Sequence, residues 1–276
     1  SITFNALNIL GSITTANSFT MLSNLSVAVN GSFSQSAGAT TFNGTSILSG
    51  TANLFNVIIN AAKTLRLGTN SFLGIASTFT KTGTLNVTTS VPNTVRYNGA
   101  GAQTIVSTTY HNLMLAGGGT KTAAGNITAN FDLTINSGVT FEAASYTFSL
   151  YRHFTNTGTF NASTSIVQLL GSNATTITGA TTFNAITENK SLAALIVTLA
   201  SSITTSTLTM TNGNMETGTN TVTITGARTG NGIITGIITH NHTFNVGTAY
   251  SFEGPRNLLT FTSPSAGLTS VTVKVK

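Results

Sequence analysis

The feature that most constrains the fold of this chain is an internal repeat that opens on an aromatic residue and a nearby asparagine. Each opening is followed by a Gly-led strand start and by a second Gly that closes a turn. Repeats with a stiff local spacing are the sequence signature of stacked, quasi-one-dimensional folds. The repeat positions are the openings Phe4, Asn5, Phe55, Asn56, Tyr110, Asn112, Phe183 and Asn184, and the closing glycines Gly44, Gly99 and Gly171.

The spacing of the repeat predicts how many coils it contains. The openings at Phe4, Phe55, Tyr110 and Phe183 lie 51, 55 and 73 residues apart. Because one solenoid coil rarely needs more than about 20 to 30 residues, we interpret each repeat as two coils and the third repeat as three. This predicts repeats at approximately residues 4–53, 54–108, 109–181 and 182–246.

Alternation of apolar and polar residues predicts strands throughout the chain. Residues 205–211 and 221–225 place Thr on one face and apolar side chains on the other. Such short runs, punctuated by Gly and Asn, are typical of strands joined by turns. The best helical candidate, residues 190–197, is short and becomes β-branched, so we interpret it as strand. The predicted fold class is all-β, a parallel β-solenoid of stacked coils.

The pattern changes in the tail, which holds two of the three prolines. We interpret residues 1–246 as the solenoid and residues 247–276 as a short C-terminal antiparallel cap or the start of a small β module. A terminal coil exposes a strand edge that must be capped or paired with another chain. Lys274 and Lys276 discourage such pairing. The candidate self-association strand nevertheless carries the apolar residues Leu268, Val271, Val273 and Val275.

Composition indicates what covers the strands and which partners to expect. Thr fills 56 positions, whereas charged residues make up only 6% of the chain, against about a quarter in ordinary globular domains. The basic residues behind the net charge of +6 are scattered singly, so we expect no nucleic-acid partner. Cys is absent, which fits a bacterial exported protein. No apolar run approaches the length of a membrane-spanning helix, and we expect no membrane insertion.

Candidate chemistry is sparse. Glu142 and Glu216 are the carboxylates that stacking could bring together for acid–base work, and solvated turn positions are the alternative. His240 and His242 lie on one strand face, but a metal pair would need a third ligand, so we expect them to face solvent. The acids are too scattered for a calcium site. We expect no catalytic residues, no cofactor, no metal and no enzymatic activity.

Regular threonines suggest one further interpretation, ice binding. Residues 207, 209 and 211 and residues 221, 223 and 225 are threonines that align within one repeat. Because earlier repeats lack matching ranks, we attribute the threonines to β propensity and a polar exterior instead.

Several segments resemble the β-strand repeats of very large secreted bacterial surface proteins. They are residues 97–105, 110–115, 118–122, 158–161 and 250–275. The resemblance implies an exported parallel β-solenoid with an adhesive or scaffolding role at the bacterial cell surface, and it brings no catalytic residues.

These observations lead to one expected function and two alternatives. We expect a non-enzymatic extracellular structural protein, a segment of a cell-surface fibre, sheath or filament that forms a homo-oligomer or polymer through strand edges. The first alternative is an adhesin or a module that binds surface glycan, with Tyr146, Tyr151 and Arg152 as candidate contacts. The second is a solenoid polysaccharide lyase or hydrolase.

Overall fold

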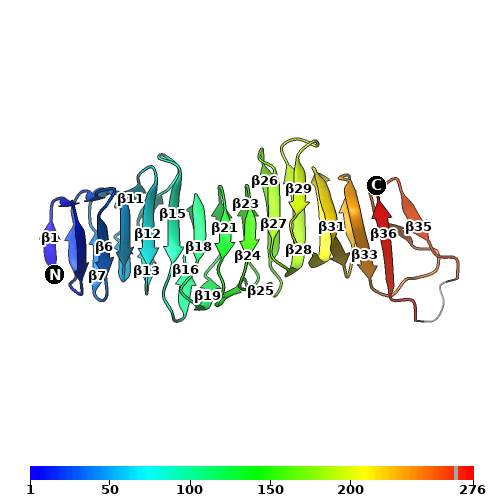
Figure 1. Ribbon diagram of the computed structural model, residues 1–276, viewed down its shortest axis with the longest axis horizontal. Helices are drawn as coiled ribbons and strands as arrows, with labels where there is room; N and C mark the ends of the chain where they lie inside the picture. The colour runs from blue at the N-terminus through cyan, green and yellow to red at the C-terminus, as the bar shows by residue number, and fades with distance from the viewer. Residues whose placement is uncertain (264–266) are drawn as a thin grey trace. The chain divides into compact units, whose positions relative to one another are not determined.

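The computed structural model describes residues 1–263 and 267–276, which contain strands, turns and bends but no helix. Parallel strands stack into a β-solenoid of about 12 turns, which confirms the predicted fold class. The chain divides into two compact units, Ser1–Phe141 and Glu142–Lys276. Within each unit, consecutive coils lie side by side (Figure 1). No helix among the described residues could span a bilayer.

In the first unit, each of the first five coils contributes one strand to each of three parallel sheets. The first sheet contains β1 (Ile2–Phe4), β4 (Phe19–Met21), β7 (Ala39–Phe42), β10 (Asn56–Ile59) and β13 (Phe79–Lys81). The second contains β2 (Leu7–Ile9), β5 (Leu25–Val27), β8 (Thr45–Ser49), β11 (Thr64–Leu67) and β14 (Thr84–Asn86). The third contains β3 (Ser12–Thr15), β6 (Ser32–Gln35), β9 (Thr51–Leu54), β12 (Ser71–Ile75), β15 (Asn93–Tyr97), β18 (Asn112–Leu115) and β21 (Leu133–Ile135). The remaining strands are β16 (Gln103–Ile105), β17 (Thr109–Tyr110), β19 (Gly119–Ala123), β20 (Ile127–Ala129) and β22 (Val139–Glu142).

The second unit has longer strands toward its end. It begins with β23 (Thr147–Leu150), β24 (Phe154–Asn156), β25 (Thr159–Asn161), β26 (Ile166–Gly171) and β27 (Thr175–Thr178). It continues with β28 (Thr181–Lys190), β29 (Ile196–Leu199), β30 (Ile203–Asn212), β31 (Asn214–Ile224), β32 (Arg228–Gly230) and β33 (Ile234–Asn241). β30 pairs with β31 through its first residues and with β32 through later ones, so one long strand serves two stretches of sheet.

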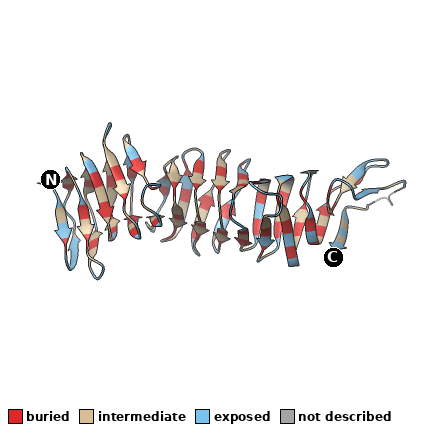
Figure 2. Cartoon of the chain, turned by 90° about the horizontal axis from the view of Figure 1, so that it is seen from above, coloured by how far each residue is buried: buried red, intermediate tan, exposed pale blue. Residues whose placement is uncertain are grey.

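The core consists of columns of inward side chains, one from each coil. Buried and exposed residues alternate along the strands (Figure 2), because successive side chains of a strand point to opposite faces. Each large apolar side chain removed from water contributes about 1.5–3 kcal/mol. One column of parallel-paired residues, all without solvent exposure, is Leu54, Ile75, Tyr97, Leu115 and Ile135.

The strand register corrects the predicted relation between repeat and coil. Phe4 pairs with Met21, Met21 with Phe42, and Phe42 with Ile59, so three coils take 55 residues. The 51-residue spacing from Phe4 to Phe55 is therefore nearly three coils, and the interpretation of that repeat as two coils was wrong. Phe55 lies four residues before the position equivalent to Phe4. The coils are shorter than the length used for the prediction, and their lengths vary from one to the next.

Aromatic side chains do contact one another inside the coils, although not as one column of repeat positions. The ring centroids of Phe4 and Phe19 lie 5.6 Å apart, and those of Phe19 and Phe33 lie 5.8 Å apart. Tyr97 and Tyr110 are 6.5 Å apart and edge-on. Aromatic and aliphatic residues therefore share the same interior, because a coil needs apolar volume at each inward position rather than a ring.

Asparagines at the coil corners tie each coil to its neighbours. The side-chain amide of Asn56 donates to the carbonyl of Gly38, one coil earlier, at 2.9 Å, and its oxygen accepts from the amide of Thr78, one coil later, at 3.2 Å. Asn112 bridges Asn93 and Asp132 in the same way, at 3.0 and 3.3 Å. Asn184 and Asn214 also donate to the preceding coil, whereas Asn5 is exposed. One direct Asn–Asn contact, Asn60 to Asn43 at 3.1 Å, matches the predicted amide ladder.

The closing glycines are required where backbones of adjacent coils approach. A Cβ on Gly44 would lie 1.8 Å from the carbonyl oxygen of Leu22, and one on Gly99 would lie 2.2 Å from that of Ala76. Gly171 combines a φ of +79° with a contact of 2.6 Å to the ring of Tyr151. Only glycine fits such positions without displacing the next coil.

The strand predicted over residues 190–197 is interrupted. β28 ends at Lys190, residues 191–195 form a turn, and β29 begins at Ile196. The amide of Leu195 donates to the carbonyl of Leu192 at 3.1 Å, which closes this turn. The run of small and apolar residues therefore marks a corner between two strands.

The C-terminal segment is antiparallel, as predicted. β34 (Ala249–Ser251) pairs with β35 (Leu258–Thr260), and β36 (Ser270–Val275) pairs antiparallel with β33 along its length. The chain direction thus reverses after the last coil. β36 covers an edge that β33 would otherwise leave free.

Candidate functional site

The residues chosen for self-association lie at the last strand of the second unit. Val271, Val273 and Val275 are half-buried in β36, in register with residues of β33, while Lys274 is exposed between them. Leu268 is half-buried but precedes the strand. Within the described residues β36 pairs only with β33. Its outer edge has no partner there.

The first coil leaves a second free edge, in the first unit. Among the described residues, β3 pairs only with β6. The carbonyls of Gly11 and Thr15 accept hydrogen bonds from the next coil. Because alternate residues of a strand direct their backbone groups to opposite sides, the N–H and C=O groups of Ser12 and Thr14 point to the free edge.

Apolar side chains of the first coil are more exposed than their equivalents in later coils. Ile13 pairs with Phe33, yet Ile13 is 42% exposed and Phe33 is 1% exposed. Ile2 and Leu10, also in this coil, are 48% and 78% exposed. These positions have one neighbouring coil where an interior coil has two.

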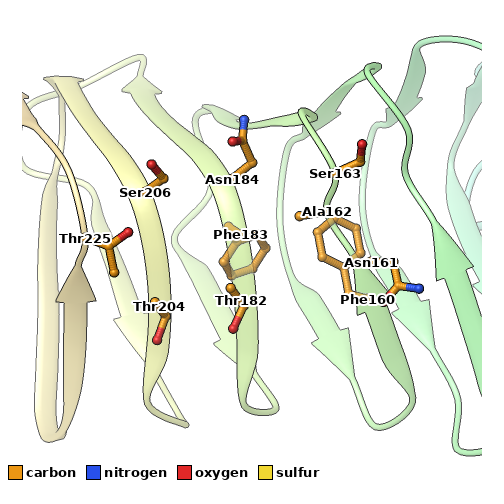
Figure 3. A pocket seen from close by; sticks show the side chains of 10 residues that line it. All are labelled: Phe160, Asn161, Ala162, Ser163, Thr182, Phe183, Asn184, Thr204, Ser206 and Thr225. Atoms are coloured by element: carbon orange, nitrogen blue, oxygen red, sulfur yellow. The ribbon is translucent and has the colours of Figure 1, made fainter. Parts of the chain in front are cut away.

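A polar groove of about 510 Å³ lies open on the surface of the second unit (Figure 3). Strands β25, β28 and β30 and the turn after β31 supply its walls. The lining contains no titratable side chain. Its residues are Phe160, Asn161, Ala162, Ser163, Thr182, Phe183, Asn184, Thr204, Ser206 and Thr225.

Aromatic packing holds the base of the groove in place. The rings of Phe160 and Phe183 lie 5.5 Å apart, and Phe154 beneath them lies 5.3 Å from Phe183. Phe160 and Phe183 are 8% and 2% exposed, so the rings form a buried floor rather than an open platform. Side chains beside them on the same strands therefore project outward from a packed layer.

Two amides in the groove are already oriented by hydrogen bonds. Asn161 donates to the carboxylate of Glu142 at 2.6 Å, and Asn184 donates to the carbonyl of Ser165 at 3.1 Å. The carbonyl oxygens of these two amides take no donor within the described residues. The same holds for the hydroxyls of Ser163, Thr182, Thr204, Ser206 and Thr225.

The groove is part of a longer ordered array of hydroxyl groups. Thr182, Thr204, Thr223, Thr239 and Thr272 are paired in sequence across β28, β30, β31, β33 and β36. Neighbouring strands lie about 4.8 Å apart, so these threonines form a rank across the strands.

This register corrects the threonine alignment expected from the sequence. Thr209 pairs with Thr187 and with Thr229, whereas Thr223 pairs with Thr204 and Thr239. The two runs that contain Thr209 and Thr223 therefore belong to different ranks. Alternating Thr-x-Asn, Thr-x-Ser and Thr-x-Thr triplets at 182, 204 and 223 were the signal that sequence reasoning missed.

The residues suggested for glycan contact do not form one patch. Tyr146 precedes β23 and Tyr151 follows it, so five residues of extended chain separate the two tyrosines by about 17 Å. Both rings and Arg152 are half-buried, and Tyr151 packs against Gly171. The open groove nearby uses other residues.

Buried charged side chains were not predicted. Glu188 has no solvent exposure, and neither carboxylate oxygen has a hydrogen-bond partner in the described part of the chain. Burial raises the pKa of Glu188 to about 8, an effect that Lys190 and Arg228 oppose. Ile186, Glu188 and Lys190 share the inward parity of β28, and this alternation was the available signal.

The buried cations bind backbone carbonyls. Lys121 donates to the carbonyls of Gly99 and Gly101 at 2.6 and 3.0 Å. Lys190 donates to the carbonyl of Leu170 at 2.8 Å and to the hydroxyl of Thr175 at 2.6 Å. Burial lowers the pKa of each lysine to about 8. These ammonium groups satisfy the corners of preceding coils, which is a structural task.

Arg228 does the same at the far end of this unit. Its guanidinium donates to the carbonyls of Gly230 at 2.8 Å and of Glu253 at 3.2 Å, and also to that of Gly232. It therefore links β32 to the segment that leads into the cap. Burial lowers the pKa of Arg228, while Glu188 opposes this shift.

The histidine pair faces the interior, contrary to the expectation of a solvent-facing pair. His240 is 2% exposed, and its ring nitrogens lie 3.1 Å from His242 and 2.9 Å from the carbonyl of Ser251. Phe252 packs edge-on against His240 at 4.5 Å. The cap segment covers this part of β33, which explains the burial.

The remaining candidates for chemistry stay apart. Glu216 pairs in register with Thr198 and Thr235, and Glu142 is held by Asn161, so stacking does not join these two acids. Among the described residues, no group of three or more His, Asp or Glu side chains could hold a metal ion.

Comparison of the chain with protein-family models, with curated proteins and with solved structures gives no match.

Proposed function

We propose that this chain is a non-enzymatic structural protein of the bacterial cell surface, a β-solenoid segment of a fibre, sheath or filament. In this proposal, copies of the chain associate end to end through strand edges, with the outer edge of β36 against the free edge of β3. The observation that carries the proposal is the first coil, where Ser12 and Thr14 direct backbone groups outward and Ile13 is 42% exposed. An unpaired strand edge is a ready template for another strand.

The surface composition supports the same proposal. Acids are absent from the first 131 residues, and the outward positions are filled mainly by hydroxyl and amide side chains. A solenoid with so few charges has little electrostatic repulsion between stacked copies. The absence of Cys is compatible with export. Lys274 on β36 is the one feature near this edge that weakens strand pairing.

A substitution at the free edge tests the proposal. Thr14→Pro removes an outward N–H group and leaves the ladder between β3 and β6 in place. Thr14→Val is the matched control because it keeps the N–H group. We expect the wild type and the valine variant to form concentration-dependent assemblies in sedimentation and electron microscopy, and the proline variant to remain monomeric. Assembly of the proline variant to the wild-type extent, or a wild type that stays monomeric, would contradict the proposal.

A further inference from the structure

We propose that the groove between β25 and the turn after β31 binds an uncharged, hydroxyl-rich glycan chain that runs across the strands. This role is additional to end-to-end assembly and uses a different surface. It rests on the lining of the groove, the free hydrogen-bonding capacity there and the packed aromatic floor.

The lining determines the charge of the ligand. Hydroxyls and amides provide every polar side chain of the groove, and the lining contains no Lys, Arg, His, Asp or Glu. Phosphate, sulfate and uronate groups are usually bound by cationic side chains, and none lines this groove. A ligand with many hydroxyl groups and no net charge, such as a neutral polysaccharide, complements it.

Free hydrogen-bonding groups show that the groove is not satisfied by the protein itself. Elsewhere on the surface, Thr209 pairs with Thr229 at 3.1 Å and Thr239 pairs with Thr272 at 2.8 Å. The groove hydroxyls of Thr204 and Ser206 have no such partner among the described residues. Hydroxyls can both donate and accept, and the two anchored amides leave carbonyl oxygens as acceptors. A sugar ring offers the matching alternation of donors and acceptors.

The dimensions of the groove favour a chain over a single sugar. Its lining spans four successive elements, β25, β28, β30 and the turn after β31. At about 4.8 Å per strand, a ligand crossing them covers about 14 Å. Phe160 and Phe183 hold the floor rigid, so little side-chain entropy is lost when the ligand binds.

The same features disfavour ice as the ligand. An ice surface needs a flat and regular hydroxyl array, whereas these threonines line a hollow and others in the rank are paired with each other. Ice binding is therefore an outcome of the test rather than a second proposal.

The test measures binding of the full chain to soluble neutral polysaccharides by affinity gel electrophoresis. The probes are mannan, β-glucan, galactan and dextran, with alginate as a charged comparison. We expect retardation by at least one neutral probe and none by alginate. The double variant Thr204→Val and Ser206→Ala keeps the side-chain volumes nearly constant, and we expect it to bind about tenfold more weakly.

The matched control is Thr209→Val, which removes an outward hydroxyl from the same strand outside the groove. We expect this variant to bind like the wild type, and circular dichroism should show that both variants stay folded. Failure of all four neutral probes, equal loss in the control and the double variant, or retardation by alginate alone would overturn the proposal. Thermal hysteresis without polysaccharide binding would overturn it in favour of ice.

Discussion

At the scale of single residues, the corner asparagines show how a chain with few charges holds its coils in register. Asn56 and Asn112 each donate one hydrogen bond to the coil before and accept one from the coil after. A backbone group at a corner has no strand partner, and burying it unpaired costs free energy. The amide side chain supplies both a donor and an acceptor, which a carboxylate does not.

Replacing one of these asparagines should destabilise the solenoid. For Asn112→Ala we expect a loss of about 1–3 kcal/mol in the free energy of unfolding, because the variant leaves the carbonyl of Asn93 and the amide of Asp132 without this partner. The measurement is urea unfolding followed by circular dichroism. Asn5→Ala is the control, since Asn5 is exposed and makes no side-chain hydrogen bond in the described part of the chain; its effect should stay within about 0.5 kcal/mol. Equal effects of the two substitutions would contradict the bridging role.

Sequence patterns located these residues better than they located their partners. Asn56 and Asn112 were predicted at corners because asparagine tolerates turn conformations. Their partners lie 18 to 22 residues away. Such partners become visible only when the coil length is known. The inward parity of Glu188 was readable in the sequence, but patterns treat a charged residue as exposed unless a partner is evident.

At the scale of elements, the strands were predictable and their register was not. Period-two alternation and Gly or Asn punctuation predict short strands wherever one face is buried. Register depends on the number of residues in each corner, and corners of different length shift Phe55 by four residues from the position equivalent to Phe4. The groove depends on this register as well, because β28 and β30 must align Thr182 with Thr204.

Strand edges at the first coil should respond to assembly in hydrogen exchange. In dilute solution we expect the amides of Ser12 and Thr14 to exchange rapidly, because they face the free edge of β3, and those of β9 in the same sheet to exchange slowly. Raising the protein concentration should slow exchange in β3 and leave β9 unchanged. Mass spectrometry of peptic peptides resolves the two segments. Rapid exchange in β3 at every concentration would show that this edge is not where copies meet.

At the scale of the whole molecule, the all-β parallel solenoid and its antiparallel end followed from composition and pattern together. Few charges, many β-branched residues and frequent turn signals agree with each other, and such agreement across levels specifies a fold. The groove was not predictable, because its residues are ordinary Thr, Ser and Asn that acquire meaning only when four elements place them side by side.

The buried acid should give the whole molecule a characteristic pH response. The pKa of Glu188 rises from 4.5 to about 8 on folding, so between these values the folded state keeps a proton that the unfolded state releases. The contribution of this group to stability is therefore greatest below about pH 4.5 and is lost as the pH rises toward about 8. Glu188→Gln removes that contribution.

The measurement for this prediction is the free energy of unfolding at several pH values across this window, for the wild type and for Glu188→Gln. We expect the difference between them to move in favour of the variant as the pH rises. His240 acts in the opposite direction, since burial lowers its pKa and stability falls as the pH drops below its unfolded value. It is common to both proteins and cancels. A difference that does not change with pH would disprove the assignment to Glu188.

The stacking of one strand on the next has a mechanical consequence. In each unit a coil is bonded mainly to the coils directly before and after it, so a pulling force that peels the outermost coil leaves the others loaded as before. Each detached coil of about 20 residues adds about 70 Å of extended chain. A fibre built from such units would yield in steps and dissipate a sudden load as length, instead of breaking at one point.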